Sequence, residues 1–312
     1  MISICIPVYN FNIASLIKEL SKQASSLTIE YEIIVIDDCS QRFLETNKAT
    51  CKEFTYIELP KNIGRASIRN LFLKYAQFEY LLFIDCDSLI ETPSLLLNYE
   101  AAIKNKPLVV CGGSTYSPKR PERNKILKWK YGIFRESKPS NIRSNIPNQS
   151  FMTNNFLIRK KILEEIKFDE RITEYGHEDT LFGLELKNNN IVITHINNPV
   201  LNSELDTNIE CLKKTTESIL NLINILNDSK YKKELMKDVA MLRFYNKVKK
   251  AENLIRLSFL FSKPIIAFLL KKGYVDLYLF DYYKLGLFIE NKKRLAKDDG
   301  TNKKGSEINL IS

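Results

Sequence analysis

The sequence predicts an α/β protein with a mostly parallel sheet flanked by helices, followed by a C-terminal helical extension. Short apolar runs alternate with segments of helical periodicity over the first two hundred residues. Strand signals then stop near Leu205, and long helical patterns follow. The excess positive charge also lies late in the chain, because residues 213–312 hold 21 basic and 11 acidic side chains, whereas residues 1–212 hold 26 of each. Two parts with different roles are therefore expected.

The elements of the first part follow in a regular order. A helix should start after Asn12, because Ile13, Leu16, Ile17 and Leu20 recur at helical spacing. Strands that alternate with helices in this way form a mostly parallel sheet covered by helices. The further expected elements are a strand at 2–8, strands YEIIVID (31–37) and FTYIEL (54–59), a helix at 64–77, the strand EYLLFID (79–85), a helix near 93–104 and the strand PLVVCG (107–112).

We expect three segments along the chain: an α/β domain over 1–205, a basic helical region over 206–290 and a flexible polar tail over 291–312. In residues 254–290 lysines and aspartates interrupt every apolar run short of the ~18 residues of a membrane span. Lysines beside apolar side chains instead suit helices that lie on an anionic membrane surface. The alternative is an ordinary helical subdomain packed on the first domain.

Cysteine usage and the start of the chain favour a cytoplasmic location, with a peripheral place on the membrane as an option. The six cysteines contain no CxxC pair and no zinc-like spacing, so we interpret them as reduced thiols. The opening MISICIPVYN lacks a positive n-region and a long apolar core, so it is expected to be a strand and not a signal peptide.

The stretch LLFIDCDSLI (81–90) ends an apolar strand with two carboxylates, Asp85 and Asp87. Ligands of parallel sheets bind at the carboxyl ends of strands. If the extended conformation continues through Cys86, both carboxylates point to one side and repel each other unless a cation lies between them. A hard divalent metal would satisfy them. The alternative is that both residues only mark a junction between strand and loop.

Four further polar stretches lie at strand ends or in the loops beyond them. They are IPVYN (6–10), IDDCS (36–40), NIGRASIRN (62–70) and GHED (176–179). Together with the DCD sequence and in this order, they resemble the family 2 glycosyltransferases over about residues 1–200. The resemblance implies the GT-A fold, a single α/β domain that binds a nucleotide sugar, and an enzyme that inverts the configuration at the sugar's anomeric carbon.

The resemblance also implies which residues bind the donor, for which we expect a UDP-sugar. The PVYN backbone and the second acid of the DD pair would hold the base and ribose, and the DCD acids would hold the ribose, the diphosphate and a Mn²⁺ or Mg²⁺ ion. The donor-binding residues are Pro7, Val8, Tyr9, Asp37, Asp38, Asn62, Gly64, Arg69, Asp85 and Asp87. The alternatives are that the DD pair forms a turn, that Gly64 is a loop hinge and that Arg69 is a solvated helix residue.

The ED pair supplies the catalytic candidates. An acceptor hydroxyl is a poor nucleophile that needs a carboxylate base, and Asp179, beside Glu178, matches the base of the family. A metal held by Asp87, with Asp85 and by resemblance His195, would stabilise the charge on the departing diphosphate. The alternatives are that the ED pair only complements a helix dipole and that His195 is a satisfied strand residue.

The acceptor side is expected in the basic loop region 114–152, near Trp129, and at Asn154 and Asn155. One basic loop in an otherwise neutral domain does not predict nucleic-acid binding. The Q-x-x-R-W motif of processive synthases is absent after the ED pair, so we expect transfer of one sugar to a glycan or lipid-linked acceptor in cell-surface polysaccharide or glycoconjugate assembly. The alternative function is a non-catalytic nucleotide-sugar-binding or membrane assembly protein.

Overall fold

The computed structural model describes residues 1–172, 175–228 and 230–308, and their side chains as far as Arg294 with the exception of Asp228. The chain divides into two compact units. The first unit consists of residues 1–120 and 131–205, and the second of residues 121–130 and the chain from Asp206 onward. The short segment 121–130 therefore belongs with the C-terminal helices, although it lies inside the first two hundred residues of the sequence.

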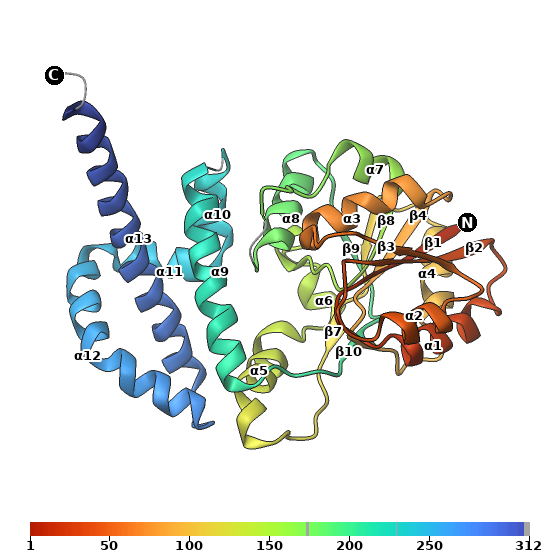
Figure 1. The fold of residues 1–312 in the computed structure, drawn as a ribbon, viewed down its shortest axis with the longest axis horizontal. Coiled ribbons are helices and arrows are strands. Elements are labelled where there is room, and N and C mark those ends of the chain that lie inside the picture. The colour runs from red at the N-terminus through yellow and green to blue at the C-terminus, as the bar shows by residue number, and fades with distance from the viewer. Residues whose placement is uncertain (173–174, 229, 309–312) are drawn as a thin grey trace. The chain divides into compact units, whose positions relative to one another are not determined.

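A seven-stranded sheet forms the centre of the first unit (Figure 1). Its strand order is β3-β2-β1-β4-β8-β6-β9, and β8 is antiparallel to both of its neighbours while the other pairs are parallel. A separate small sheet has the order β5-β10-β7. The strands are β1 (Ile2–Val8), β2 (Tyr31–Asp37), β3 (Thr55–Glu58), β4 (Tyr80–Ile84), β5 (Ser88–Leu89), β6 (Val109–Cys111), β7 (Ser114–Thr115), β8 (Asn155–Arg159), β9 (Thr194–His195) and β10 (Val200–Asn202).

Helices cover both faces of this sheet, which explains why the central strands are apolar throughout. Along β1, Ile4 and Ile6 pack in the core that contains α1 and α4, whereas Cys5 packs in the core of α3, α7 and α8. The helices of the first unit are α1 (Ala14–Ala24), α2 (Leu44–Thr50), α3 (Gly64–Tyr75), α4 (Leu95–Ile103), α6 (Ser140–Arg143), α7 (Lys160–Glu165) and α8 (Glu178–Asn188). The predicted fold class is confirmed, although α2 was not predicted.

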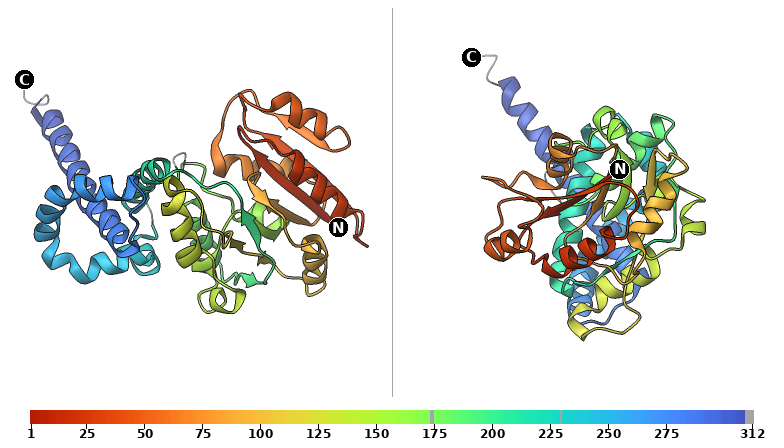
Figure 2. Two further views of the ribbon diagram at one scale, coloured as in Figure 1. Left: turned by 90° about the horizontal axis from the view of Figure 1, so that it is seen from below. Right: turned by 90° about the vertical axis from the view of Figure 1, so that its right-hand side faces the viewer.

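The second unit is helical. Its helices are α5 (Ile126–Tyr131, which ends one residue past the unit), α9 (Asn208–Asp228), α10 (Lys232–Asp238), α11 (Ala240–Val248), α12 (Glu252–Lys271) and α13 (Leu277–Ile308). Helix α12 packs on α13 and α9, and Figures 1 and 2 both show α12 beside α13. Because α13 continues to Ile308, it extends into the segment for which the polar sequence predicts a flexible tail; residues 309–312 lie outside the described part of the chain.

One helical stretch in the described chain, Ala240–Lys271, is long and apolar enough to cross a membrane by length and composition. Only 17% of its most apolar part is buried. Arg256 and Lys263 interrupt the apolar runs of residues 253–270, as the sequence predicts, but they are the only charged residues there, so the stretch as a whole keeps the average hydropathy of a span. Isolated cations do not bring the average hydropathy below that of a span.

Aromatic packing stabilises the core between the sheet and α8. The rings of Phe83 and Phe156 stack with their centroids 4.9 Å apart, and those of Phe168 and Phe182 stack at 3.9 Å. Phe151 meets the edge of Phe156 at 5.1 Å. This cluster fixes β4, β8 and α8 relative to one another, and β4 and α8 carry the expected site residues.

We predict that Phe156→Ala lowers the free energy of unfolding by about 3–5 kcal/mol, because it leaves a cavity in a core position with no exposed surface. Urea unfolding followed by circular dichroism measures the change. Phe134→Ala is the matched control, since that ring is 63% exposed and its loss should cost less than about 0.5 kcal/mol. Equal losses in the two variants would contradict the proposed role of the cluster.

Candidate active site

A pocket of about 370 Å³ lies at the carboxyl ends of β1, β2 and β4, beside the start of α3. It collects residues from segments that are far apart in the sequence, as ligand sites of open α/β sheets do. The pocket is lined by Pro7, Val8, Tyr9, Phe11, Asp38, Asn62, Gly64, Arg65, Ile68, Arg69, Asp85, Cys86, Asp87, Ile172, Tyr175 and Glu178. The pocket thus brings together nine of the ten predicted donor-binding residues and the predicted catalytic residue Glu178.

Asp38 connects the end of β2 to the start of α3. Its Oδ1 accepts the N–H of Ile63 at 2.7 Å and its Oδ2 accepts the N–H of Gly64 at 3.0 Å, so both groups at the helix start are satisfied. Gly64 has φ +83°, a conformation that glycine adopts without strain. Burial raises the pKa of Asp38, although the two N–H groups oppose the shift. Asn62 donates to the Asp38 carbonyl at 3.2 Å.

Asp37 does not line the pocket, and the expectation that it binds the donor is not supported. Its side chain is fully buried. Its Oδ1 accepts the N–H of Ser40 at 2.7 Å, and its Oδ2 accepts the hydroxyl of Tyr56 at 2.9 Å. The first contact closes the turn after β2, and the second ties that turn to β3. Asp37 is therefore the turn residue of the DD pair, and Asp38 is the residue on the pocket.

The DCD sequence forms a turn and not an extension of β4, which ends at Ile84. The N–H of Ser88 donates to the Asp85 carbonyl at 3.0 Å, so the two acids do not alternate along a strand. Asp85 accepts Arg69 Nη2 at 2.9 Å, whereas Asp87 is exposed on the pocket. Burial and the two carboxylates raise the pKa of Cys86 to about 12, which keeps this thiol protonated.

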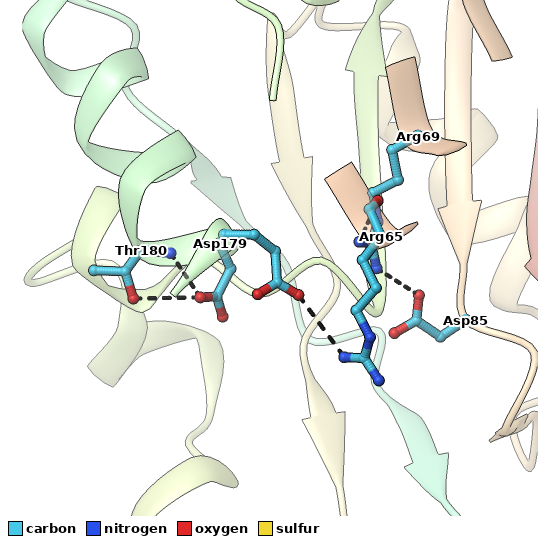
Figure 3. A network of polar contacts seen from close by, with 6 residues as sticks. Arg65, Arg69, Asp85, Asp179 and Thr180 are labelled. Carbon is cyan, nitrogen blue, oxygen red and sulfur yellow. Dashed lines mark hydrogen bonds and ion pairs between the residues drawn. The ribbon is translucent and has the colours of Figure 1, made fainter. Parts of the chain in front are cut away.

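Two arginines, one turn apart on α3, face the acids (Figure 3). Arg69 is only 2% exposed; its Nη1 donates to the Arg65 carbonyl, and its Nε has no hydrogen-bond partner among the described residues. Arg65 Nη1 lies 3.8 Å from Glu178 Oε1, and its guanidinium lies over the Tyr175 ring at 4.9 Å. Arg65 and Tyr175 were not among the site residues predicted from the sequence. The i, i+4 spacing of Arg65 from Arg69 was an available signal, but no pattern marked Tyr175.

The ED pair begins α8 after His177, which has φ +70°. Asp179 Oδ1 accepts the N–H of Thr180 at 2.6 Å (Figure 3), while the Glu178 carboxylate lies within 3.8 Å of the Arg65 guanidinium. Burial and the negative charge of Glu178 raise the pKa of Asp179 to about 6. A carboxylate with this pKa can take up a proton near neutral pH. Glu178 lines the pocket, and Asp179 follows it without lining the pocket itself.

His195 lies in β9 away from the pocket lining, and its contacts do not support a role in metal binding. One ring nitrogen contacts Arg143 Nη1, and Nε2 contacts the carbonyl of Pro147 at 2.8 Å. Burial and the positive charge of Arg143 lower the pKa of His195, which favours the neutral ring. Because both ring nitrogens have protein partners, His195 is a satisfied structural histidine that helps to position the buried guanidinium of Arg143.

The structure places the expected acceptor-side residues in different environments. Asn155 is fully buried and donates to the carbonyls of Gly113 and Asn198 while accepting the Tyr99 hydroxyl at 2.7 Å, so it is structural and not an acceptor contact. Asn154 is partly buried, and its Oδ1 has no hydrogen-bond partner within the described chain. Trp129 belongs to the second unit, so the structure does not place it against the pocket.

The pocket suits a divalent ion whose coordination is completed by oxygen atoms of a substrate. No group of three His, Cys, Asp or Glu side chains that could hold a metal is present in residues 1–172, 175–228 and 230–308. Asp85 is paired with Arg69, and Asp87 is an exposed carboxylate that lines the pocket. Mg²⁺ commonly binds through one or two carboxylates together with substrate phosphates. The donor set at Asp87 is therefore suitable for an ion shared with a diphosphate.

Comparison with known proteins agrees with this geometry. The curated relatives that the chain matches include TarP of Staphylococcus aureus strain N315, a poly(ribitol-phosphate) beta-N-acetylglucosaminyltransferase that is 24% identical over 266 residues, 76% of this chain and 74% of TarP. For the first curated relatives, the match spans about a third of their length or less.

Two solved structures share the fold. S. aureus TarS residues 1–349 has a TM-score of 0.53 and 19% identity, with 96% of this chain and 91% of TarS covered. The mannosyltransferase PcManGT from Pyrobaculum calidifontis, in complex with GDP-Man and Mn²⁺, has a TM-score of 0.60 and 13% identity, with coverage of 94% and 86%. These similarities confirm the predicted GT-A fold.

The family model named glycosyl transferase family 2 matches residues 3–167, which include β1 from its second residue, β2 to β8, and all pocket-lining residues except Ile172, Tyr175 and Glu178. This match covers more than half of the chain, and it contains the PVYN, DD, Asn62–Asn70 and DCD segments. The chain belongs to glycosyl transferase family 2.

Proposed function

We propose that this protein is an inverting, metal-dependent glycosyltransferase that moves a single sugar from a UDP-sugar to a glycan or lipid-linked acceptor. The observation that carries the proposal is that one pocket joins Asp38, Arg69, Asp87 and Glu178 from four separate segments. Such a pocket offers hydrogen-bonding groups at one side and charges of both signs at the other. A nucleoside diphosphate sugar has the matching sequence of groups.

The nucleoside end of the donor is proposed to bind near Asp38 and the PVYN backbone. The Asp38 carboxylate is already fixed by two backbone N–H groups, so it can accept a ribose hydroxyl without losing its position. Arg69 and Arg65 lie at the other end. The unsatisfied Nε of Arg69 and the loosely paired guanidinium of Arg65 are suitable donors to phosphate oxygens.

Departure of the nucleoside diphosphate leaves negative charge on a phosphate oxygen. Mn²⁺ or Mg²⁺ at Asp87 would act as a Lewis acid that stabilises this charge. The two arginines supply fixed positive charge in the same region, and Asp85 holds Arg69 in place at 2.9 Å. In this proposal Asp85 acts as a positioning residue for Arg69, and Asp87 acts as the metal ligand.

Asp179 is the proposed base, which removes the proton from the acceptor hydroxyl as this attacks the anomeric carbon. Its raised pKa makes it a better proton acceptor than an ordinary carboxylate, while it remains ionised at neutral pH. Attack from the face opposite the diphosphate inverts the anomeric configuration. Glu178 is proposed to maintain this raised pKa and to hold Arg65 until the donor binds.

The acceptor and the place of action are proposed from chemistry and from relatives. TarP acts, by its name, on poly(ribitol-phosphate), which supports a role in cell-surface polymer assembly. The excess of basic residues after position 212 suits a polyanionic or lipid-linked acceptor at the cytoplasmic face of an anionic membrane. Asn154, with its unpaired Oδ1, and Trp129 remain proposed acceptor-side residues.

We predict that UDP raises the melting temperature more in the presence of Mn²⁺ than with chelator, because Asp87 and the diphosphate together would hold the ion. In Asp87→Asn the Mn²⁺-dependent part of this shift should be lost. His195→Gln is the control, since it should lower the melting temperature of the free protein but keep the Mn²⁺-dependent shift. Differential scanning fluorimetry with a panel of UDP-sugars provides the measurement.

A Mn²⁺-dependent shift that survives in Asp87→Asn but disappears in His195→Gln would contradict the assigned metal site. A stabilising donor that is neither hydrolysed nor transferred would instead favour the alternative function, a non-catalytic nucleotide-sugar-binding protein. If no nucleotide stabilises the protein, the proposed donor site is wrong.

We predict that kcat/KM falls below pH 6, because Asp179 with a pKa of about 6 must be deprotonated to act as a base. Removal of the Glu178 charge in Glu178→Gln should lower the pKa of Asp179 and move the acid limb of the profile to lower pH. Asp179→Asn should reduce kcat by about 100-fold or more, the usual contribution of a general base. The pH dependence of transfer or donor hydrolysis measures these effects.

An unchanged acid limb in Glu178→Gln would show that another group titrates. A large loss of kcat in Glu178→Gln with near-normal activity in Asp179→Asn would show that Glu178, which lines the pocket, is the general base in place of Asp179.

A further inference from the structure

Helix α12 has two apolar faces, and only one of them is covered. Phe259, Ile266 and Leu270 are buried on the inner face, at most 4% exposed. The opposite side, here termed the outer face, consists of apolar side chains that are between 52% and 71% exposed. These are Leu254, Leu257, Leu260, Phe261, Ile265 and Phe268. Leu254, Leu257, Phe261, Ile265 and Phe268 recur at steps of three and four residues, so they form one stripe along a helix that is ~30 Å long, and Leu260 flanks this stripe.

The inner face is held firmly to α13. The Phe259 ring lies 5.9 Å from Tyr282 and 5.8 Å from Tyr283, and a Cβ on Gly286 would collide with it. Lys263 Nζ forms an ion pair with Glu290 at 2.6 Å. If α12 crossed the bilayer without α13, lipid would surround it and these contacts would be lost. The helix is therefore placed to expose one long side only.

The charge around the outer face indicates what covers it. Residues 240–275 contain eight basic side chains and a single acid, Glu252, which contacts Tyr245 and Lys293. Exposed lysines lie at both ends of the helix, with Lys249 and Lys250 before its start, Lys271 as its last residue and Lys272 directly after it. A second copy of the chain that packed this face against itself would bring two positive surfaces together. An anionic surface is the complementary partner.

We infer that the outer face of α12 inserts into the interface of an anionic lipid bilayer, with the helix parallel to the membrane and its terminal lysines among the headgroups. Buried apolar area and attraction to anionic lipid both stabilise such a helix. This inference rests on the membrane association proposed above, but it does not depend on the donor or on catalysis. It assigns the association to a particular surface of the second unit.

Flotation of the full chain with liposomes tests the inference. The wild type should bind vesicles of phosphatidylcholine with 30% phosphatidylglycerol, about tenfold or more better than vesicles of phosphatidylcholine alone, and high salt should weaken this binding. Phe261→Ser combined with Ile265→Ser should lower binding about tenfold or more. Lys249→Gln, Lys250→Gln, Lys271→Gln and Lys272→Gln together should lower binding to anionic vesicles to a similar extent.

Two control variants replace exposed side chains of the same kinds, apolar and basic, outside α12. Val192→Ser combined with Ile209→Ser takes away side chains that are 67% and 62% exposed, and Lys104→Gln combined with Lys106→Gln removes two exposed cations. Both controls should bind anionic vesicles like the wild type. All variants should keep the melting temperature of the wild type, because every changed side chain is exposed, and they should keep its thermal response to UDP and Mn²⁺.

Several results would overturn the inference. If the wild type and the outer-face variants float equally well with anionic vesicles, α12 is not the surface that binds the membrane. If the wild type does not bind anionic vesicles, both the proposed membrane association and its assignment to α12 are wrong. Resistance to extraction by alkaline carbonate would indicate a spanning helix, and a dimer in ultracentrifugation that Phe261→Ser and Ile265→Ser dissociate would assign the face to a second copy. The UDP response reports on the catalytic proposal independently.

Discussion

Burial of the central strands on both faces is the constraint on which the site depends. Between two helical layers, β1, β2 and β4 have no solvated face, so their interior positions are apolar and their polar side chains lie at the ends. Tyr9, Asp38 and Asp85 follow these three strands in turn. Because the strands are parallel neighbours, their ends coincide, and the turns beyond them form one pocket.

The pocket contains two pairs of an arginine and a carboxylate, and a bound diphosphate would change the interactions within them. Arg69 and Asp85 form a close pair, whereas Arg65 and Glu178 form a looser pair at 3.8 Å. In the proposed function, Arg65 would exchange Glu178 for the diphosphate of the donor, while the close pair of Arg69 and Asp85 would keep its geometry. Such an exchange would also alter the charge beside Asp179, so donor binding and readiness of the proposed base would be coupled.

Much of the fold and the position of the site could be predicted from the sequence, since apolar runs and the residues that follow them are local signals. The roles of individual polar residues could not. Asp37 and Asp38 are identical neighbours, yet one closes a turn and the other lines the pocket. The polar atoms of Asn155 and His195 form buried hydrogen bonds with residues that are distant in the sequence. Tyr175 reaches the pocket from a loop without any periodic pattern.

The central claim is direct displacement at this pocket, and the configuration of the first product tests it most directly. Slow hydrolysis of an α-configured UDP-sugar in the presence of diamagnetic Mg²⁺ can be followed by proton NMR before the released sugar equilibrates. The account predicts that the β-anomer appears first, because water replaces the acceptor on the face opposite the diphosphate. Initial release of the α-anomer would contradict direct displacement by a single base.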